Sequence, residues 1–542
     1  MKNPSFLFIA MFYVLCGSCN SDDGNDQGKL VDIPDVQIVC DGLSPVDMSD
    51  AGIVLSGADC SETGLRNAIQ QGGKILCDCG TSTINITSEI QITKDVILDG
   101  GNMTLDGGSS TRIFHKLPNP GGIDFTLQNI KLQNGRSDGG GASFFLRSGG
   151  LILARSYDNN MALGGNLTCI NVTFENGRTA SASENDVAGG AVYVFGVAEA
   201  IFSGCVFNHN QSSNGGAIGN LGSDLLIYNS VFANNQALGD NFLAGFGGAI
   251  YVDGVASGGL NDVYEVCGTI FINNGAVRSG GATASVVSDN KDILVSFDKC
   301  TFSQNRAGIN GGDYVGGAIY HIEDENAGGA GSGEENFWLL NTTLTNNEAR
   351  LQGGGLWIII DGKGTIANCT FYQNKALKPM GSLGGAIAIA NAGYGGNYLV
   401  VHSTFAENTT EFFSGASYVS SPNFVSFHQN IFYNNRGAQN YAGLGHQLNG
   451  DAGSYSANGN LNIYYPPTIP NGSADGLILI GSLTEDPLLL PPSPNGGPTF
   501  TMALQPGSPA IDAGNPLLAP PADQRGVMRD AQPDLGAYEF GH

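Results

Sequence analysis

The sequence is poor in charge, and above all in positive charge. Only 13% of its 542 residues are charged, and 23 lysines and arginines stand against 49 aspartates and glutamates, a net charge of −26. Nucleic acid and anionic membrane surfaces are therefore poor partners, and we expect no nucleic acid to bind. Few long helices are expected. The composition, with 81 glycines, suits short stacked strands joined by small polar loops.

The sequence also lacks an early apolar run long enough to span a bilayer. The run over residues 6–15 is far shorter than the roughly 20 residues that a span needs, and it predicts a signal peptide over residues 1–18. The Gly-Ser-Cys that ends at Cys19 resembles the end of a bacterial lipobox, although Cys16 holds the place that leucine usually takes. That resemblance implies lipidation of Cys19, and ordinary cleavage of a soluble secreted protein is the alternative. Residues 19–30 are polar and acidic, which predicts a tether.

What the sequence has in abundance is repetition. A Phe-x-x-Asn motif recurs with one leucine variant, and it alternates with a Gly-Gly motif. The Phe-x-x-Asn copies are Phe207/Asn210, Phe232/Asn235, Phe271/Asn274, Phe302/Asn305, Leu344/Asn347, Phe371/Asn374, Phe405/Asn408 and Phe432/Asn435. The Gly-Gly copies begin at Gly189, Gly215, Gly247, Gly280, Gly316, Gly353 and Gly384. From Phe207 to Phe432 the motif advances in seven steps of about 32 residues, a period typical of a solenoid.

Each copy alternates as a strand does, so that Phe371 and Cys369 share one face while Thr370 takes the other. We expect Phe to point inward, and Asn to end the strand in left-handed backbone with its amide bonded between coils. The glycines should form the next corner, followed by a second short strand with Ile250, Ile319 and Ile387 inward. Parallel strands about 4.8 Å apart in successive coils then satisfy each other's backbone groups.

This pattern predicts an all-β fold, a right-handed single-stranded parallel β-helix, whose hand follows the usual crossover rule. A β-propeller is the alternative. It is disfavoured because the marks of its blades are missing and because the spacing of the Phe positions is uneven, from 25 residues (207 to 232) to 42 residues (302 to 344). Loops on a β-helix accommodate such variation.

The repeats resemble those of polymorphic outer-membrane proteins, in which GGA(I/L/V) and FxxN motifs alternate as they do here over residues 170–440. This resemblance implies a β-helical, surface-displayed and often adhesive chain, and it carries over no catalytic residue. The block from Cys60 to Gly135 is similar to the N-terminal portion of secreted β-helix proteins of the CSLREA type. The last part resembles choice-of-anchor Q domains through Asp486-Pro487, Asn495 to Pro498, Pro506 to Gly514, Asp523 to Gly526 and Asp534 to Glu539.

Together these patterns divide the chain into five parts. They are a signal peptide (1–18), an acidic tether (19–30), an N-terminal cap with a short helix (31–80), a parallel β-helix (81–465) and a choice-of-anchor Q-like, loop-rich C-terminal cap (466–542). In the N-terminal cap, Leu65, Ala68 and Ile69 lie on one face of a short amphipathic helix. Such a helix would cover the open end of the solenoid, whose exposed edge otherwise invites aggregation.

Four cysteines crowd the N-terminal cap. The resemblance to the CSLREA type makes Cys60 and Cys79 the two cysteines that flank the cap helix. In an oxidising compartment we expect Cys60 to pair with Cys79 and Cys40 to pair with Cys77. A metal site at Cys77 and Cys79 is the alternative, but no second close pair or histidine accompanies them.

Three further cysteines, Cys205, Cys300 and Cys369, fall in alternate coils of one inward column. The strand spacing puts neighbours in that column about 9.6 Å apart. A disulfide reaches only about 7 Å between Cα atoms, so we expect buried free thiols.

The best candidate metal ligands are His321, Glu323, Asp324 and Glu325, in an expected loop after Tyr320. Calcium is the one cofactor that they leave open, and an ordinary solvated acidic loop is the alternative.

A second candidate site lies on the outward face of the Gly-Gly-Ala strands. The position two residues after the alanine of that motif reads Tyr193, Gly219, Tyr251, Ala284, Tyr320, Trp357 and Ala388 along the stack. Tyr320 and Trp357 should be neighbours and, with Tyr251, form an exposed aromatic platform of the kind that stacks on sugar rings. The alternative is that long loops cover these rings.

The sequence thus predicts an exported, lipid-anchored protein of the outer-membrane surface, or otherwise a secreted one, acting as a monomer in display, adhesion or glycan binding. Its partner would be an extracellular polysaccharide or a host or cell-surface glycan. The alternative is a polysaccharide lyase or glycoside hydrolase, a class that also uses this fold. A lyase needs a base and cations beside a uronate, but lysines and arginines are scattered among the acids and no basic groove is visible. Whether the protein is an enzyme is left open.

Overall fold

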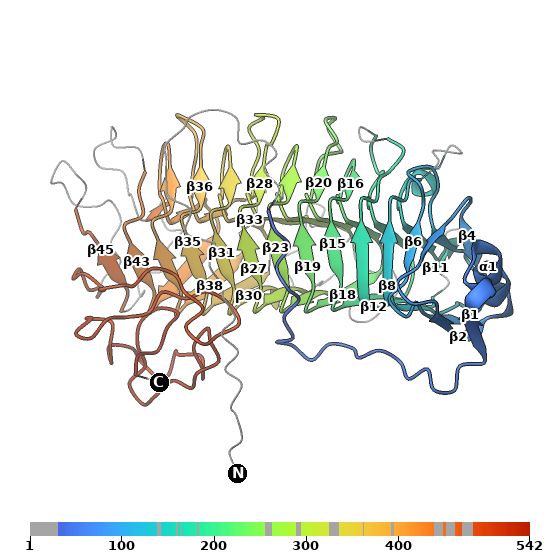
Figure 1. Ribbon diagram of the computed structural model, residues 1–542. Coiled ribbons are helices and arrows are strands. Elements are labelled where there is room, and N and C mark those ends of the chain that lie inside the picture. The colour runs from blue at the N-terminus through green and yellow to red at the C-terminus, as the bar shows by residue number, and fades with distance from the viewer. Residues whose placement is uncertain are drawn as a thin grey trace, which may run out of the picture. The chain divides into compact units, whose positions relative to one another are not determined.

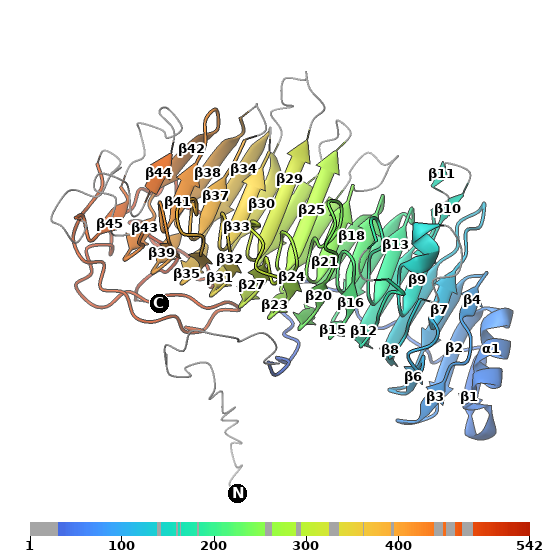
Figure 2. The same cartoon turned by 90° about the horizontal axis from the view of Figure 1, so that it is seen from above.

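The computed structural model describes residues 31–137, 143–158, 161–162, 164–181, 184–254, 263–288, 294–324, 335–360, 362–391, 395–437, 448–450, 461–468 and 481–541. The expected signal peptide and tether, with Cys19, lie outside these residues. The chain from Val31 onward forms one unit, built as a stack of coils whose strands run parallel from coil to coil (Figures 1 and 2). This is the parallel β-helix that the repeats predict. Of the described residues, no helix is both long and apolar enough to cross a membrane.

Three sheets form the walls of the stack, and we call them sheets A, B and C. Sheet A contains β1 (Ile53–Ser56), β2 (Gly73–Asp78), β3 (Thr83–Asn85), β5 (Val96–Asp99), β6 (Thr104–Asp106), β8 (Phe125–Gln133), β12 (Leu167–Glu175), β14 (Glu199–Ser203), β15 (Val206–Asn208), β18 (Asp224–Tyr228), β19 (Val231–Ala233), β22 (Val263–Cys267), β23 (Ile270–Ile272), β26 (Leu294–Asp298), β27 (Thr301–Ser303), β30 (Glu335–Leu340), β31 (Thr343–Thr345), β34 (Lys363–Ala367), β35 (Thr370–Tyr372), β38 (Asn397–Val401), β39 (Thr404–Ala406), β42 (Phe424–His428), β43 (Ile431–Tyr433) and β45 (Ile463–Tyr465).

Sheet B contains the strands that follow the Gly-Gly corners and their counterparts in the first coils. They are β4 (Ile90–Ile92), β7 (Phe114–Lys116), β9 (Ile152–Arg155), β13 (Val192–Phe195), β17 (Ile218–Leu221), β21 (Ile250–Asp253), β25 (Thr283–Ser288), β29 (Ile319–Asp324), β33 (Leu356–Ile359), β37 (Ile387–Ile389), β41 (Ser417–Val419) and β44 (Leu448–Gly450). Sheet C contains the short strands β16 (Gln211–Ser212), β20 (Gln236–Ala237), β24 (Gly275–Ala276), β28 (Arg306–Ala307), β32 (Glu348–Ala349), β36 (Lys375–Ala376) and β40 (Thr409–Thr410). A separate hairpin joins β10 (Tyr157–Asp158) to β11 (Met161–Ala162).

The phenylalanines of the repeat point inward and stack face to face, as the alternation predicts. Neighbouring ring centroids lie 4.5 to 5.0 Å apart in the pairs Phe174–Phe207, Phe207–Phe232, Phe232–Phe271, Phe271–Phe302, Phe371–Phe405 and Phe405–Phe432. On sheet B, Ile250, Ile319 and Ile387 are fully buried in the same core. The interior is therefore one continuous apolar column, which each coil extends.

The asparagines of the repeat form a second column, which we call the asparagine ladder. Each Nδ2 donates to the Oδ1 of the next coil's asparagine at 2.8 to 3.0 Å, from Asn210 through to Asn435. The expected bonding between coils is thus confirmed, but the expectation about the backbone is wrong by one residue. The left-handed position is the residue before the ladder asparagine, with φ of 52° to 58° from His209 to Asn434. A side chain there points outward, where asparagine, histidine, glutamine and glutamate all fit.

The Gly-Gly corners need glycine for two separate reasons. The first glycine has positive φ, for example 67° at Gly316. The second has no room for a side chain, because a Cβ on Gly281 would lie 2.0 Å from the carbonyl oxygen of Gly317 in the next coil. The corner therefore fixes how closely successive coils approach.

The predicted cap helix is present as α1 (Glu62–Gln71), which follows η1 (Gly57–Asp59) beside the first strands (Figure 1). Ser61 accepts a hydrogen bond from the backbone N–H of Gly64, so it caps the helix although no acid follows three residues later. Leu65, Ala68 and Ile69 are buried, as expected from their common face. Cys60 and Cys79 form the expected disulfide.

Residues 31–48, which we call the N-terminal strap, run along the outer face of sheet A. The backbone N–H of Val39 donates to the side chain of Asn229, and that of Val46 donates to Gln128. Cys40 is therefore far from Cys77, and it pairs with Cys267 at the end of β22. The expected Cys40–Cys77 bond is wrong, because Cys77 points into the core as a free, buried thiol.

The thiols of Cys205, Cys300 and Cys369 are free and buried, as predicted. They share a column with Ser230 and Thr269, so Cys205 and Cys300 are three coils apart and not two. Burial raises the pKa of all three thiols, that of Cys205 to about 12.

The described C-terminal residues, 481–541, contain none of the named strands and fold back along sheet A (Figure 1). Gln524 lies against this face, where Thr343 and Thr370 bond to its side-chain amide. Two buried ion pairs hold the segment together, Arg525 with Asp523 at 2.7 Å and Arg529 with Glu539 at 2.9 Å. The strap and this segment cover different stretches of sheet A.

Candidate functional site

The outward row of sheet B has the register that the sequence predicts. Tyr193, Gly219, Tyr251, Ala284, Tyr320, Trp357 and Ala388 are successive partners along the stack. The rings of Tyr320 and Trp357 stack with centroids 4.9 Å apart and planes 3° from parallel. Both side chains are half-buried, so their surfaces reach solvent. The indole Nε1 of Trp357 donates to Oε1 of Gln352 at 3.1 Å, which fixes the orientation of the ring.

Phe246 connects this pair to Tyr251 across the coil that carries Ala284. Its ring centroid lies 5.8 Å from that of Tyr320 and 6.3 Å from that of Tyr251. We call Tyr251, Phe246, Tyr320 and Trp357 the aromatic ridge. Burial raises the pKa of Tyr320 to about 12, and burial together with the neighbouring Asp253 raises that of Tyr251 further. Both hydroxyls are therefore neutral at physiological pH and can donate hydrogen bonds.

Loops do cover the row at its N-terminal end. Tyr193 is 3% exposed, because Phe144 of η2 (Phe144–Arg147) packs edge-on against its ring. Leu153 and Phe195 complete this cluster. Loops thus cover the start of the row, at Tyr193, while the aromatic ridge further along remains partly exposed.

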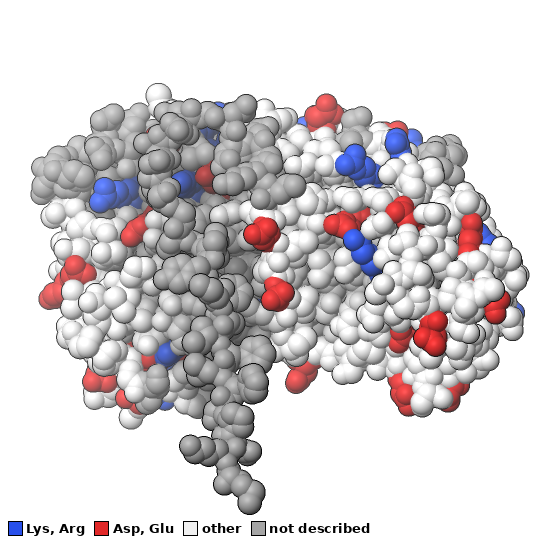
Figure 3. Space-filling model, in the orientation of Figure 1, with Lys and Arg blue, Asp and Glu red and all other residues white. Residues whose placement is uncertain are grey.

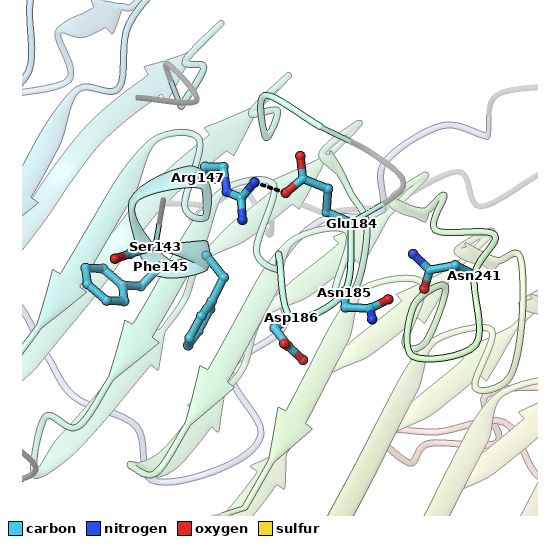
Figure 4. A pocket seen from close by; sticks show the side chains of 8 residues that line it. Ser143, Phe145, Arg147, Glu184, Asn185, Asp186 and Asn241 are labelled. Carbon is cyan, nitrogen blue, oxygen red and sulfur yellow. Dashed lines mark ion pairs between the residues drawn. The ribbon is translucent and has the colours of Figure 1, made fainter. Parts of the chain in front are cut away.

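A pocket of about 540 Å³ lies beside the covered start of the row (Figure 4). Figure 4 shows Arg147 and Glu184 paired at its rim, with Asp186 and Asn185 on the adjoining turn and Asn241 across from them. Phe144 and Phe145 supply the apolar lining. One arginine faces two carboxylates, so this end of the outer face is acidic.

A cation is held against the ridge itself. The guanidinium carbon of Arg278 lies 5.1 Å from the ring centroid of Tyr314, 5.8 Å from that of Phe242 and 6.0 Å from that of Phe246. Such contacts attract a cation to the faces of the rings. Within the described chain no carboxylate forms an ion pair with Arg278, and its buried Nε has no hydrogen-bond partner.

More cations follow on the strands and loops of sheet C. Residues 275–281, 306–316, 348–353 and 375–384 each lead into the next Gly-Gly corner, and we call them the basic strip. Their cations are Arg278, Arg306, Arg350, Lys375 and Lys378, and their carboxylates are Asp313 and Glu348. Five positive charges thus face two negative ones, an excess of three in a chain of net charge −26. Figure 3 shows most of the visible lysines and arginines in the upper half of the molecule, where Figure 1 places sheet C.

The overall composition conceals this strip, because the lysines and arginines are outnumbered in the chain as a whole. The available signal was the position directly after the ladder asparagine, which holds Arg306, Glu348 and Lys375 in three successive coils. That position lies on sheet C, in register, and Arg306 Nε bonds to Glu348 Oε2 at 2.9 Å.

The four expected metal ligands lie only partly within the described residues. His321 and Glu323 belong to strand β29, not to a loop, and both point into the core. His321 bonds to Ser285 and stacks on Phe337, and burial lowers its pKa to about 3. The side chain of Asp324 and the whole of Glu325 lie outside the described residues. Among the residues that are described, no group of three His, Cys, Asp or Glu side chains could hold a metal ion.

No protein-family model matches the chain, and no curated protein is significantly similar to it in sequence. The case for function therefore depends on the geometry of the outer face of sheet B.

Proposed function

We propose that this chain is an exported cell-surface protein that binds a glycan on the aromatic ridge. The observation that carries the proposal is the stacked, half-buried pair Tyr320 and Trp357. Sugar rings present apolar C–H faces that lie flat on aromatic rings, while their hydroxyls remain hydrated at the edges. A protein that binds glycans without converting them needs such a surface and little more.

The fold makes the ridge rigid before any ligand arrives. Tyr251, Tyr320 and Trp357 lie on strands that pair with a strand on each side, and Gln352 holds the indole of Trp357. Preorganised rings lose little freedom on binding, which favours affinity. From Tyr251 to Trp357 the row spans three coil steps, or roughly 14 Å at the strand spacing, enough for several sugar units.

The location at the cell surface rests on the sequence. Resemblance to choice-of-anchor Q, CSLREA and polymorphic outer-membrane proteins favours export and display, and the lipobox-like end at Cys19 favours a lipid anchor. Labelled palmitate should enter the wild type and not the Cys19→Ala variant, because only the lipobox cysteine carries the diacylglyceryl group. Equal labelling of both would show that Cys19 does not carry the lipid.

Binding is best tested on a panel of neutral and acidic polysaccharides by affinity electrophoresis and calorimetry. We expect Trp357→Ala to weaken binding about tenfold or more, in line with the loss of a stacking partner. Phe424→Ala is the matched control, because Phe424 is a 42% exposed aromatic residue on sheet A, away from the ridge. If both variants bind as the wild type does, or if no polymer binds, the ridge is not a glycan site.

A polysaccharide lyase or glycoside hydrolase is the second candidate, because the pocket beside the covered start of the row contains an arginine and two carboxylates (Figure 4). Arg147 neutralises Glu184, which makes Asp186 the candidate base or acid. Incubation with the same panel should then release unsaturated ends, detected by ultraviolet absorbance, or reducing ends, and Asp186→Asn should abolish the release. A panel without products would leave binding as the function.

A further inference from the structure

The ridge lies beside the basic strip, where five lysines and arginines accompany two carboxylates. Tyr314, whose ring contacts Arg278, lies two residues before the Gly-Gly corner that leads into β29 and Tyr320. Gln352, which bonds to Trp357, is two residues from Arg350. The basic strip therefore borders the stacked pair along its side.

The two carboxylates of the strip do not neutralise all of its five cations. Asp313 accepts from both Lys378 at 2.6 Å and Arg350 at 3.3 Å, and the Lys378 ammonium holds its pKa below the ordinary value. Glu348 is likewise shared, between Arg306 at 2.9 Å and Lys375 at 4.0 Å. Each acid thus faces two cations, and no carboxylate of the described residues forms an ion pair with Arg278.

Arg278 is the most informative of these cations. Its guanidinium is held by three aromatic rings and not by an acid, so its charge is fixed in place but not neutralised. A guanidinium presents a planar fork of donors that fits carboxylate and sulfate groups. One of the three rings, Phe246, is itself part of the ridge, so a sugar on Tyr320 would lie near this fork.

We propose that the ligand of the aromatic ridge is an acidic glycan, whose carboxylate or sulfate groups pair with Arg278 and the basic strip while its rings stack on Tyr320 and Trp357. This inference rests on the proposed glycan binding and adds the chemical class of the ligand. It also explains why an acidic protein keeps an excess of three positive charges here. The rest of its negative surface would repel the same ligand, so binding would be confined to this strip.

The test compares polymers that differ only in charge. Polygalacturonate is measured against its carboxyl-reduced form, and dextran sulfate against dextran, so that carboxylate and sulfate recognition are read separately. We expect at least one charged polymer to bind about tenfold tighter than its neutral partner, since a hydrogen bond to a charged group is worth about one decade of affinity. The preference should shrink as salt is added, because exposed charges are screened.

Arg278→Gln should lower the affinity for the charged polymer about tenfold more than the affinity for its neutral partner, and continued binding of the neutral polymer would show that the ridge is still folded. Arg436→Gln is the matched control, because Arg436 is an exposed arginine in the same sheet-C register but beyond the strip. Equal binding of charged and neutral polymers, or equal effects of the two substitutions, would overturn the inference.

Two further outcomes distinguish a failure of this inference from a failure of the proposed glycan binding. If the neutral polymers bind through Trp357 and charge adds nothing, the acidic-glycan inference fails while the ridge remains a glycan site. If no polymer binds, both fail. A single-stranded oligonucleotide serves as a polyanion without sugar acids, and binding of the oligonucleotide as tight as that of the charged glycan would show a general polyanion surface and overturn the inference.

Discussion

The inward side of sheet A and the outward side of sheet B differ in how much their side chains vary from coil to coil. Inward, from Phe174 to Phe432, the phenylalanine column repeats one side chain with a single leucine at Leu344. Outward, the row on sheet B changes from tyrosine to glycine, alanine and tryptophan within seven coils. Packing between coils constrains the first set, because every copy must fit its two neighbours. The second set meets no such demand, so its rings and charges are available for recognition.

The largest effect should come from breaking the inward column. Phe302→Ala should lower the free energy of unfolding by about 3 to 5 kcal/mol, as for an aromatic residue deleted from a core. Its ring stacks on Phe271 at 4.7 Å and packs against Leu344 in the next coil, so two coils share the void. Denaturant titration gives the loss, and hydrogen exchange should show the middle coils opening while α1 stays protected. A loss below about 1 kcal/mol would mean that the column does not carry the fold.

The asparagine ladder permits a comparison between adjacent residues. Asn347→Ala should cost about 2 to 3 kcal/mol, because its buried amide makes four hydrogen bonds, two as donor and two as acceptor. Asn346 lies one residue earlier, in left-handed backbone at φ 54°, with its side chain on the outside. Asn346→Gly should therefore leave stability almost unchanged. Thermal melts of both variants test this order, and equal losses would contradict our division of the two roles.

The N-terminal strap should respond more weakly, because it covers the stack and is not part of it. Replacing Cys40 and Cys267 together by serine should cost about 2 kcal/mol, within the usual range for a disulfide, and the loss should be local. Hydrogen exchange should rise over residues 31–48 and over β19 and β23 beneath them, where Val31 and Val36 now pack on Ile272. The Cys60→Ser/Cys79→Ser variant is the control, and it should open the α1 end instead.

The parts of this structure that the sequence predicted are the parts with a period. Alternation within a strand places Phe302 inward, and repetition makes Tyr320 and Trp357 neighbours, without any knowledge of the loops. The strap has no period, so nothing in it shows that Cys40 meets Cys267, 227 residues away. The contacts of Arg278 with Phe242 and Tyr314 could not be predicted either, because these two rings come from corner loops of unequal length.

Other errors came from reading polarity as exposure. The polar side chains of His321 and Glu323 suggest a loop, but both residues lie on strand β29. Because the side chain of Tyr320 points outward, alternation along the strand places those of His321 and Glu323 inward. There the buried side chains find partners, His321 in Ser285 and Glu323 in Asn336. Strand alternation predicts the inward direction of both side chains, and at this point it is a stronger signal than polarity.

The smallest effect on stability should come from the outward row. Trp357→Ala should cost about 1 kcal/mol or less, because the indole is half-buried and its loss removes one stacked pair and one hydrogen bond to Gln352. Binding, by contrast, should fall about tenfold if the ridge holds a glycan. Thermal melts of Trp357→Ala and Phe302→Ala, measured side by side, test which of the two side chains points inward and which points outward. A larger loss of stability for Trp357→Ala than for Phe302→Ala would reverse inside and outside, and the ridge could then no longer be a surface on which a sugar stacks.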